Sequence, residues 1–533
     1  MSRTKATLAL YFLLPAFFFA TAPAASQEAQ TLRITSVEYE MDRKTKEYAL
    51  STKVKIDRER VFSSIEELES YLDGIKSQIE SLRAFETVEL EYEESLADES
   101  GMVSNVSVRI YTEDSKHLVV LPYPKYSSSE GFSVKLKIKD TNFFGTLEDF
   151  SADLSYGAKT KPDGSFDKNE FGAAVSYNYP FRLAVLDSLW LNDHKITYSP
   201  GDDSPAWKLS TGLALAFSAG RVKIVNEFRQ KFFRYIDEDV EDYDGRTTIV
   251  DKETFLVEYD KLSFPITTLT TEKFGNLEVS PFVDFSLAWS PYSSDHSDLL
   301  LKRELFGGID ITFGRVGWIK NLRNGFDIAV NTKFGRNFTN DNTVYEAKAE
   351  ARGFKAFIFE FDDERSFEFG IFFDVFAFYA SNTTEYFGER LRGVYDKPYF
   401  ATRGFTDRKS TVSKNGFVAS VDVPFKITRI YWEDLPSFQK ITWLRMFDME
   451  VQAGPFTSLA LFDNKAADTD MNLADGFFTM GGEIIIYPLH WKGIQLRASF
   501  GYDLSRVIPF FNKDWRSDDY SEYEISIGFG LHY

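Results

Sequence analysis

Apolar and polar residues alternate without a break over the last eleven residues of the chain, YEISIGFGLHY. Every second residue from Tyr523 to Tyr533 is apolar, and glutamate, serine, glycine or histidine lies between them. This period of two is the pattern of a β-strand with one apolar and one polar face. A tilted strand of about ten residues crosses a bilayer, and an aromatic residue at each end lies at headgroup level. Because lipid does not tolerate an unpaired strand edge, the segment predicts a closed barrel that includes the terminal aromatic Tyr533.

The same alternation recurs between residues 131 and 533, in segments separated by polar, glycine-rich or acidic turns. Clear examples begin at Phe150, Phe171, Leu209, Phe326 and Leu496. Sixteen or seventeen such segments can be counted, and single-chain bacterial barrels usually have an even number of strands. We therefore expect a membrane all-β fold, a 16-stranded antiparallel transmembrane β-barrel over residues 131–533, with a large soluble all-β protein as the alternative.

One of these segments places four charged residues in succession on the same face. In YEAKAEAR, the face opposite the alanines consists of Glu346, Lys348, Glu350 and Arg352. Unpaired charge is very costly to bury in a dry core, whereas the interior of a membrane barrel is polar. These charges therefore favour a wet barrel interior over the core of a β-sandwich.

The start of the chain has the features of a secretory signal peptide. Arg3 and Lys5 precede an apolar run of thirteen residues, and small residues follow at Ala24 to Ser26. The run is too short to cross a membrane as a helix, so residues 1–26 predict a cleaved signal peptide, with a membrane anchor as the alternative. No later run contains about eighteen consecutive apolar residues, so we expect any membrane contact to be made by strands.

Composition argues against several classes of function. The chain has no cysteine, which excludes disulfides and thiolate metal sites. Its net charge of −20 argues against a nucleic-acid partner, because binding phosphates requires basic patches. The five histidines are scattered without metal-ligand spacing, and no nucleophile or phosphate-binding motif is present. We expect no catalytic residue, cofactor or metal; the acidic run at 237–244 is either a cation-binding loop or a solvated one.

Residues 31–116 have a different pattern, which mixes helix and strand. Ser64 and Glu67 form a capping box, and apolar residues from Ile65 to Leu82 then recur at helical spacing. Short strand-like segments surround this helix, two of them before it. We expect a small, independent α+β domain.

These two regions together resemble a family of outer-membrane proteins. The segment LRAFETVELEYE at 82–93, followed by VSVRIYTED at 106–114, is similar to the end of a POTRA domain. The segment DTNFFGTLEDF at 140–150 resembles the first barrel hairpin of the outer-membrane β-barrel assembly (Bam/Tam-type) family. That resemblance implies one POTRA domain followed by a bacterial surface antigen-type 16-stranded barrel. One departure is the second strand-like segment before the helix, where the family usually has one.

The tripeptide Arg403, Gly404 and Phe405 matches the Arg-Gly-aromatic signature of that family. The resemblance implies that it lies at the tip of an extracellular loop, near residues 390–412, that folds back into the barrel. Five strand-like segments follow it, the number that the family has after this loop. An ordinary solvated loop is the alternative reading of Arg403.

The resemblance also implies acidic partners for Arg403 on the barrel wall. Asp463 matches the family's aspartate, although Leu461 departs from the usual residue two positions before it. Where the family often has a glutamate on the preceding strand, this chain has Ser420, with Asp422 two residues on and on the same face by alternation. A guanidinium inside a barrel needs such a partner.

The segment GFSVKLKIKD at 131–140 is expected to be the first barrel strand, and it would meet the last strand where the barrel closes. Alternation turns its lysines inward, and glycines on the last strand weaken pairing because they supply no cross-strand contact. Such a lateral seam is expected to open and to pair with a client strand. The seam residues are Lys135, Lys137, Lys139, Glu524, Gly528 and Gly530.

The resemblance implies outer-membrane protein assembly and insertion, or polypeptide translocation, without enzymatic chemistry. The expected location is the outer membrane of a diderm bacterium, with the N-terminal domain in the periplasm. The expected partners are outer-membrane lipid, client outer-membrane or secreted polypeptides, and periplasmic accessory proteins. Two alternatives remain open: a two-partner-type secretion pore, and a passive porin or surface-exposed binding protein.

Overall fold

The computed structural model describes most of the chain from residue 31 onward, and the predicted signal peptide at 1–26 lies outside the described residues. The described ranges are 31–42, 44–95, 103–127, 131–160, 166–183, 186–200, 206–219, 222–234, 238–241, 247–250, 254–271, 274–289, 302–338, 341–361, 366–381, 385–386, 412–463, 471–512 and 523–529.

The N-terminal part folds into a four-stranded sheet in the order β2-β1-β4-β3, with two helices packed on one face. Its elements are β1 (Thr31–Asp42), α1 (Glu47–Lys53), β2 (Val61–Phe62), α2 (Ile65–Ser81), β3 (Phe85–Ser95) and β4 (Val103–Asp114). Ser64 caps α2 by accepting a hydrogen bond from the Glu67 backbone, as the capping box predicts, and the apolar side of α2 is buried on the sheet. Two strands, β1 and β2, precede α2 as expected, but the second is β2; the strand-like pair Val54 and Ile56 lies directly after α1, whose last residue is capped by Val54.

Within the described part of the chain, no helix is both long enough and apolar enough to cross a membrane.

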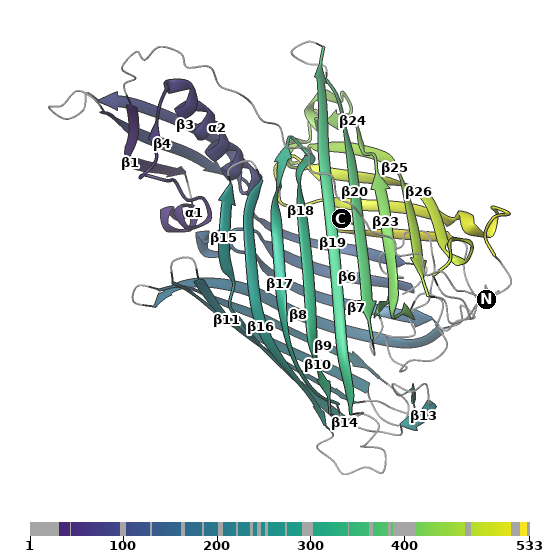
Figure 1. Cartoon of the computed structure of the whole chain (residues 1–533). Helices are drawn as coiled ribbons and strands as arrows, with labels where there is room; N and C mark the ends of the chain where they lie inside the picture. The colour runs from purple at the N-terminus through teal and green to yellow at the C-terminus, as the bar shows by residue number, and fades with distance from the viewer. Residues whose placement is uncertain are drawn as a thin grey trace, which may run out of the picture.

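From Leu118 onward the chain forms a closed antiparallel barrel, with the N-terminal domain at one end of it (Figure 1). Its strands are β5 (Leu118–Ser127), β6 (Gly131–Asp140), β7 (Phe150–Thr160), β8 (Phe166–Leu183), β9 (Leu186–Ser199), β10 (Ala206–Ala219), β11 (Val222–Arg234), β14 (Thr254–Ser263), β15 (Ile266–Thr271), β16 (Gly275–Trp289), β17 (Lys302–Ile319), β18 (Leu322–Asn337), β19 (Asn342–Glu360), β20 (Ser366–Ala380), β23 (Asn415–Asp422), β24 (Phe425–Ile430), β25 (Met449–Phe462), β26 (Phe477–Pro488), β27 (Leu496–Asp503) and β28 (Tyr523–Phe529). Two small hairpins lie outside the barrel sheet: β12 (Glu238–Glu241) with β13 (Thr247–Val250), and β21 (Glu385–Tyr386) with β22 (Val412–Ser413).

The barrel has more strands than the expected sixteen. β14 and β15 pair with the same two neighbours on either side of Pro265, and β23 and β24 do so on either side of Pro424. Counting each of these pairs as one strand, the described residues contain eighteen barrel strands. The expectation missed β5, whose Pro122 and Pro124 conceal its strand pattern, so the predicted barrel began at Gly131 instead of Leu118. Adding β5 to seventeen segments gives eighteen, which is again even.

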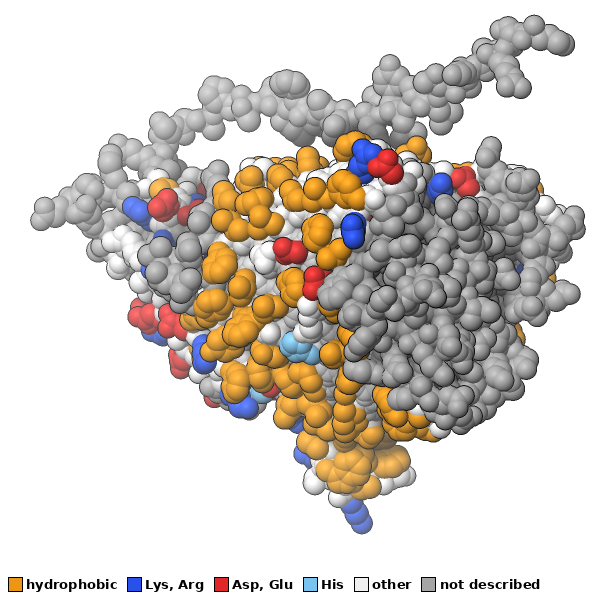
Figure 2. All heavy atoms as spheres, turned by 90° about the horizontal axis from the view of Figure 1, so that it is seen from below, with side chains coloured by type: hydrophobic (Ala, Val, Ile, Leu, Met, Phe, Trp, Pro, Cys, Tyr) orange, Lys and Arg blue, Asp and Glu red, His pale blue; other side chains and the backbone are white. Residues whose placement is uncertain are grey.

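The two faces of the barrel wall differ as the alternation predicts. Hydrophobic side chains cover the outer surface that is visible in Figure 2, and few charged side chains lie among them. The charged residues of β19 face inward and pair with each other and with β18: Lys333 Nζ lies 3.2 Å from Glu346, and Arg352 donates to Asp327 at 2.9 Å. The expected charged inner face is therefore confirmed for this part of the wall.

Candidate functional site

The barrel closes between β28 and β5, and we call this contact the seam. Over the described residues, its ladder consists of two residue pairs, Ser526 with Ser127 and Ile527 with Tyr126. The ladders on either side are much longer: seven pairs join β27 to β28, and ten pairs join β5 to β6. Because backbone hydrogen bonds hold neighbouring strands together, the described part of the seam is joined over fewer positions than either neighbouring contact.

Two prolines lie on the edge of β5 that faces the seam. Every second residue of an antiparallel strand directs its N–H and C=O groups to the same neighbour, so residues 122, 124 and 126 face one side. The β5–β6 ladder runs without a shift through Pro122 and Pro124, and a proline fits a ladder only where its nitrogen faces away from the partner. Both prolines therefore face β28, and the seam edge of β5 lacks two donors.

The prediction that residues 131–140 form the closing contact is wrong. That segment is β6, the second barrel strand, and it lies between β5 and β7. Its lysines are turned toward β7: Lys137 lies 3.7 Å from Asp153, and Lys139 lies 3.3 Å from Asp149. Lys135 shares their face by alternation.

The other predicted seam residues belong to the last strand. Gly528 lies on β28 opposite Arg497 of β27, and no atom would approach a Cβ added to it within 4 Å. Gly530, Tyr533 and the side chain of Glu524 lie outside the described residues. The seam therefore retains its predicted glycine on one side, while its other side is β5.

The predicted loop motif Arg403, Gly404 and Phe405 lies outside the described residues, so its contacts stay a prediction. Asp463 follows β25 and accepts hydrogen bonds from the Asn415 side chain at 2.5 Å and from the backbone of Met471 at 3.1 Å. These contacts connect the ends of β23 and β25 and fix the start of the next loop.

Ser420 and Asp422 share the inner face of β23, where both are buried. Ser420 lies opposite Asp374 of β20 and donates a hydrogen bond to Ser458 of β25 at 2.8 Å. Asp422 lies opposite Phe372 and Phe456 on the same two neighbours.

The inner wall also carries a buried apolar cluster that the sequence analysis missed. It spans β20, β23, β25 and β26 and consists of Phe376, Phe378, Ala380, Val418, Ala460, Phe462 and Phe477. A signal was available, because SFEFGIFFDVFAFYA is apolar on both faces instead of one. A strand that is apolar on both faces indicates burial on both sides.

Arg83 joins the N-terminal domain to two separate turns of the barrel. Its side chain is 8% exposed, donates to Asn321 Oδ1 at 3.0 Å and donates to the Lys492 carbonyl. The guanidinium also lies over the Trp318 ring, 4.3 Å from its centroid, and near Tyr487. Burial lowers the pKa of Arg83 to about 10, which leaves the group charged at neutral pH. One side chain thus holds the β17–β18 turn and the β26–β27 turn.

A second set of contacts joins the domain to the β6–β7 turn. Asn142 donates to Thr45 Oγ1 at 2.6 Å, and the backbone of Lys46 donates to the Gly145 carbonyl at 2.9 Å. Gly145 has a φ of +73°, and a Cβ there would collide with the backbone of the N-terminal domain. Glycine is required at this position both for its conformation and for the close approach.

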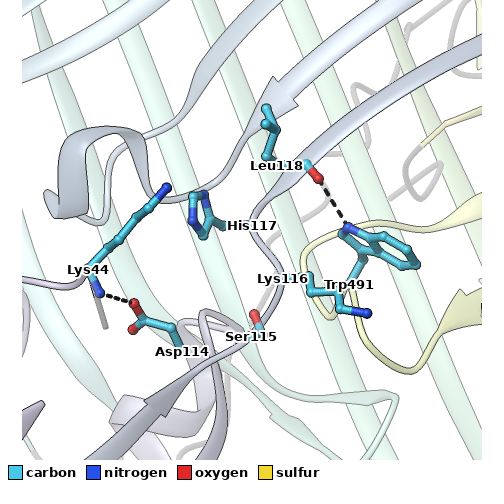
Figure 3. A pocket seen from close by; sticks show the side chains of 7 residues that line it. All are labelled: Lys44, Asp114, Ser115, Lys116, His117, Leu118 and Trp491. Carbon is cyan, nitrogen blue, oxygen red and sulfur yellow. Dashed lines mark hydrogen bonds between the residues drawn. The ribbon is translucent and has the colours of Figure 1, made fainter. Parts of the chain in front are cut away.

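A cavity of about 250 Å³ lies beside the linker that enters β5 (Figure 3). It is lined by Lys44, Asp114, Ser115, Lys116, His117, Leu118 and Trp491. His117 Nδ1 lies 2.7 Å from Asp140 Oδ1, and Trp491 Nε1 donates to the Leu118 carbonyl at 3.2 Å. The base of β5 is therefore tied to the β26–β27 turn.

Within the described ranges, no three histidine or acidic side chains form a group that could hold a metal ion. The acidic run at 237–244 lies partly outside those ranges, and its described residues Glu238–Glu241 pair with β13.

No family model and no curated protein sequence matches this chain. Among solved structures, it is similar to CdiB from Acinetobacter baumannii, with 11% identity, 93% of this chain and 74% of that chain covered, and a TM-score of 0.49. It is also similar to CdiB from Escherichia coli, with 10% identity, coverage of 96% and 93%, and a TM-score of 0.42. A third similar structure is BamA from Haemophilus ducreyi lacking POTRA domains 1–3, with 11% identity, coverage of 93% and 84%, and a TM-score of 0.37.

Proposed function

We propose that this chain is an outer-membrane barrel that inserts or translocates polypeptides by opening its seam, without enzymatic chemistry. The short ladder between β28 and β5 is the observation that carries this proposal. An opened seam exposes two strand edges, and a client strand pairs with either edge through the same backbone hydrogen bonds. The two prolines of β5 keep the closed state weak, because they remove donors from one edge.

Three further features support the proposal. The exposed apolar outer wall fits lipid, and the paired charges inside fit water. The N-terminal domain contacts the barrel end at which β5 begins, so it lies at the first residues of a seam strand. The resemblance to POTRA-plus-barrel proteins implies the outer membrane of a diderm bacterium as the location. It also implies that the domain lies in the periplasm, where accessory proteins and client polypeptides reach it.

A disulfide across the seam tests the proposal directly, because the chain has no cysteine of its own. The pair Tyr126→Cys with Ile527→Cys lies in register across the seam. Depletion of the native chain is expected to remove a set of outer-membrane or secreted proteins, and the reduced variant is expected to restore them. The oxidised variant, with its seam locked, is expected not to restore them.

The matched control keeps Ile527→Cys and pairs it with Ala498→Cys, which lies opposite on β27. That disulfide joins two strands that stay paired, so activity is expected to persist. A seam-locked protein that forms at high yield and remains fully active would rule out lateral opening.

A polypeptide secretion pore of the two-partner type is the second candidate, and the charged inner wall favours it. The ion pairs of β18 and β19 line the barrel interior with polar groups that suit a hydrated path. In this case the client crosses the interior, so the seam disulfide leaves secretion intact. If the chain is instead a passive porin, we expect the barrel to conduct small solutes. Depletion of the chain should then remove no other outer-membrane or secreted protein.

A further inference from the structure

Residues 431–448 connect β24 to β25 at the barrel end that carries the N-terminal domain, and we call them the aromatic loop. The loop contains two short 3-10 helices, Trp432–Asp434 and Thr442–Phe447. It is closed at its base, where Trp432 donates from its backbone to Asp448 at 2.9 Å and from its ring to the Phe447 carbonyl at 2.7 Å. Arg445 pairs with Glu433 at 3.0 Å. The loop is therefore folded on its own contacts.

Although it is folded, the aromatic loop leaves large apolar side chains on its surface. Trp443 is 59% exposed. The other exposed members are Tyr431, Leu435, Phe438, Ile441, Met446 and Phe447. A compact loop that presents this many apolar groups marks a surface that contacts something apolar.

This surface continues the outer wall of the barrel. Phe425 begins β24, and its ring lies 5.8 Å from that of Phe369, which stacks on Phe357 of β19 at 4.8 Å. The exposed rings of Phe359 and Phe367 extend this row on the outer face of β19 and β20. β24 then leads into the aromatic loop without interruption, through the 62% exposed Ile427.

The composition of the loop is that of a segment at the boundary between lipid and water. Tryptophan and tyrosine have amphipathic rings that lie at headgroup level. Charged side chains of both signs, Glu433, Asp434, Lys440 and Arg445, are exposed among the apolar ones, as in a segment that has one side in lipid and the other in water. A protein partner requires no such continuity with the lipid-facing wall, whereas a membrane does.

We propose that the aromatic loop is a membrane-binding element that inserts Trp443 and its apolar neighbours into the leaflet on the side of the N-terminal domain. The proposal rests on the proposed membrane location of the barrel. The loop is also linked to the start of β5, because the Phe447 ring lies 6.0 Å from that of Trp491, which in turn donates to the Leu118 carbonyl. Lipid contact at the loop therefore bears on the strand that opens.

The absence of native cysteine allows single labels on the full chain in vesicles of phosphatidylethanolamine and phosphatidylglycerol. An environment-sensitive fluorophore is attached at Trp443→Cys, with Met446→Cys as a second site in the same loop. Two further sites serve as controls. Ile311→Cys on the outer face of β17 is the control for lipid contact, and Glu59→Cys on the exposed surface of the N-terminal domain is the control for solvent.

With spin-labelled quencher lipids, emission at Trp443→Cys, Met446→Cys and Ile311→Cys is expected to fall about two-fold, because these labels lie against acyl chains. Emission at Glu59→Cys is expected to stay unchanged. If Ile311→Cys is quenched but both loop labels, like Glu59→Cys, are not, the loop does not contact acyl chains. The inference is then wrong, and the apolar surface of the loop is assigned to a protein partner. If Ile311→Cys is also unquenched, the membrane barrel itself is wrong, and the loop inference falls with it.

Discussion

At the scale of single residues, Arg83 carries the clearest prediction about stability. It has a φ of +53°, which is unusual for a residue with a side chain, so its contacts must offset backbone strain. We expect Arg83→Ala to weaken the local contact with the barrel by about 2–4 kcal/mol, through loss of charged hydrogen bonds and of a desolvated cation–π contact. Hydrogen exchange at residues 317–321 measures this effect.

The matched control is Arg109→Ala in the same domain, where an exposed guanidinium lies 3.7 Å from Glu38. An exposed pair of this kind contributes about 0–1 kcal/mol. Equal exchange at residues 317–321 in the two variants would show that Arg83 does not hold the turn.

Glu67 carries a prediction about pH. Hydrogen bonds from the side chain and backbone of Ser63, with a further one from Arg60, lower the pKa of Glu67 to about 2. A carboxylate with a lowered pKa stabilises the fold above its unfolded pKa of about 4.3 and loses that contribution as pH falls toward the folded value. Fraying of the first turn of α2 is therefore expected between about pH 4.3 and 2. Glu67→Gln should remove this dependence in exchange measurements on residues 64–68, and unchanged curves would contradict the assignment.

At the scale of elements, the prolines of β5 carry a prediction about how firmly the barrel closes. Pro122→Ala combined with Pro124→Ala restores two donors on the seam edge. Each added hydrogen bond contributes about 0.5–1.5 kcal/mol, partly offset by the greater freedom of the unfolded chain. We expect the folded form of the variant, measured by its migration on a gel, to survive to a higher temperature than that of the native chain. We also expect the variant to be less active.

Pro180→Ala is the control for this change, because Pro180 lies within β8 and away from the seam. We expect Pro180→Ala to change neither the activity nor the hydrogen bonding between β5 and β28. If the double variant at the seam is as active as the native chain, the prolines do not set the rate of opening.

At the scale of the whole molecule, the N-terminal domain is anchored to barrel turns that are far apart in strand order. Eight strands separate the β6–β7 turn held by Asn142 from the β17–β18 turn, one of the two held by Arg83, counted over the described residues with β14 and β15 as one strand. Two linked contacts bind more firmly than either one alone. We expect Arg83→Ala or Asn142→Ala singly to leave the domain docked and the double variant to release it. Limited proteolysis of the linker at residues 115–117 measures release, and release by either single variant would show that the anchors do not act together.

The sequence by itself determined the local structure and the two faces of the barrel wall. Alternation is a property of neighbouring residues, so it predicted the inward charges of β19 and the five strands that follow the loop motif. The Ser64 and Glu67 pair likewise predicted the start of α2, although the Glu67 carboxylate turns to Ser63 instead of Ser64.

Only the tertiary structure decided which strands meet and which side chains join the two parts of the chain. The partner of β28 depends on backbone hydrogen bonds between segments about four hundred residues apart, as Ser526 and Ser127 are, and no local period encodes such a register. Pro122 and Pro124 concealed the strand pattern of β5, so β5 was missing from the predicted barrel. The same two residues lack an N–H group on the edge of β5 that faces the seam. No pattern in the sequence pointed to Arg83, because its contacts with Trp318 and Lys492 form only when the N-terminal domain docks on the barrel.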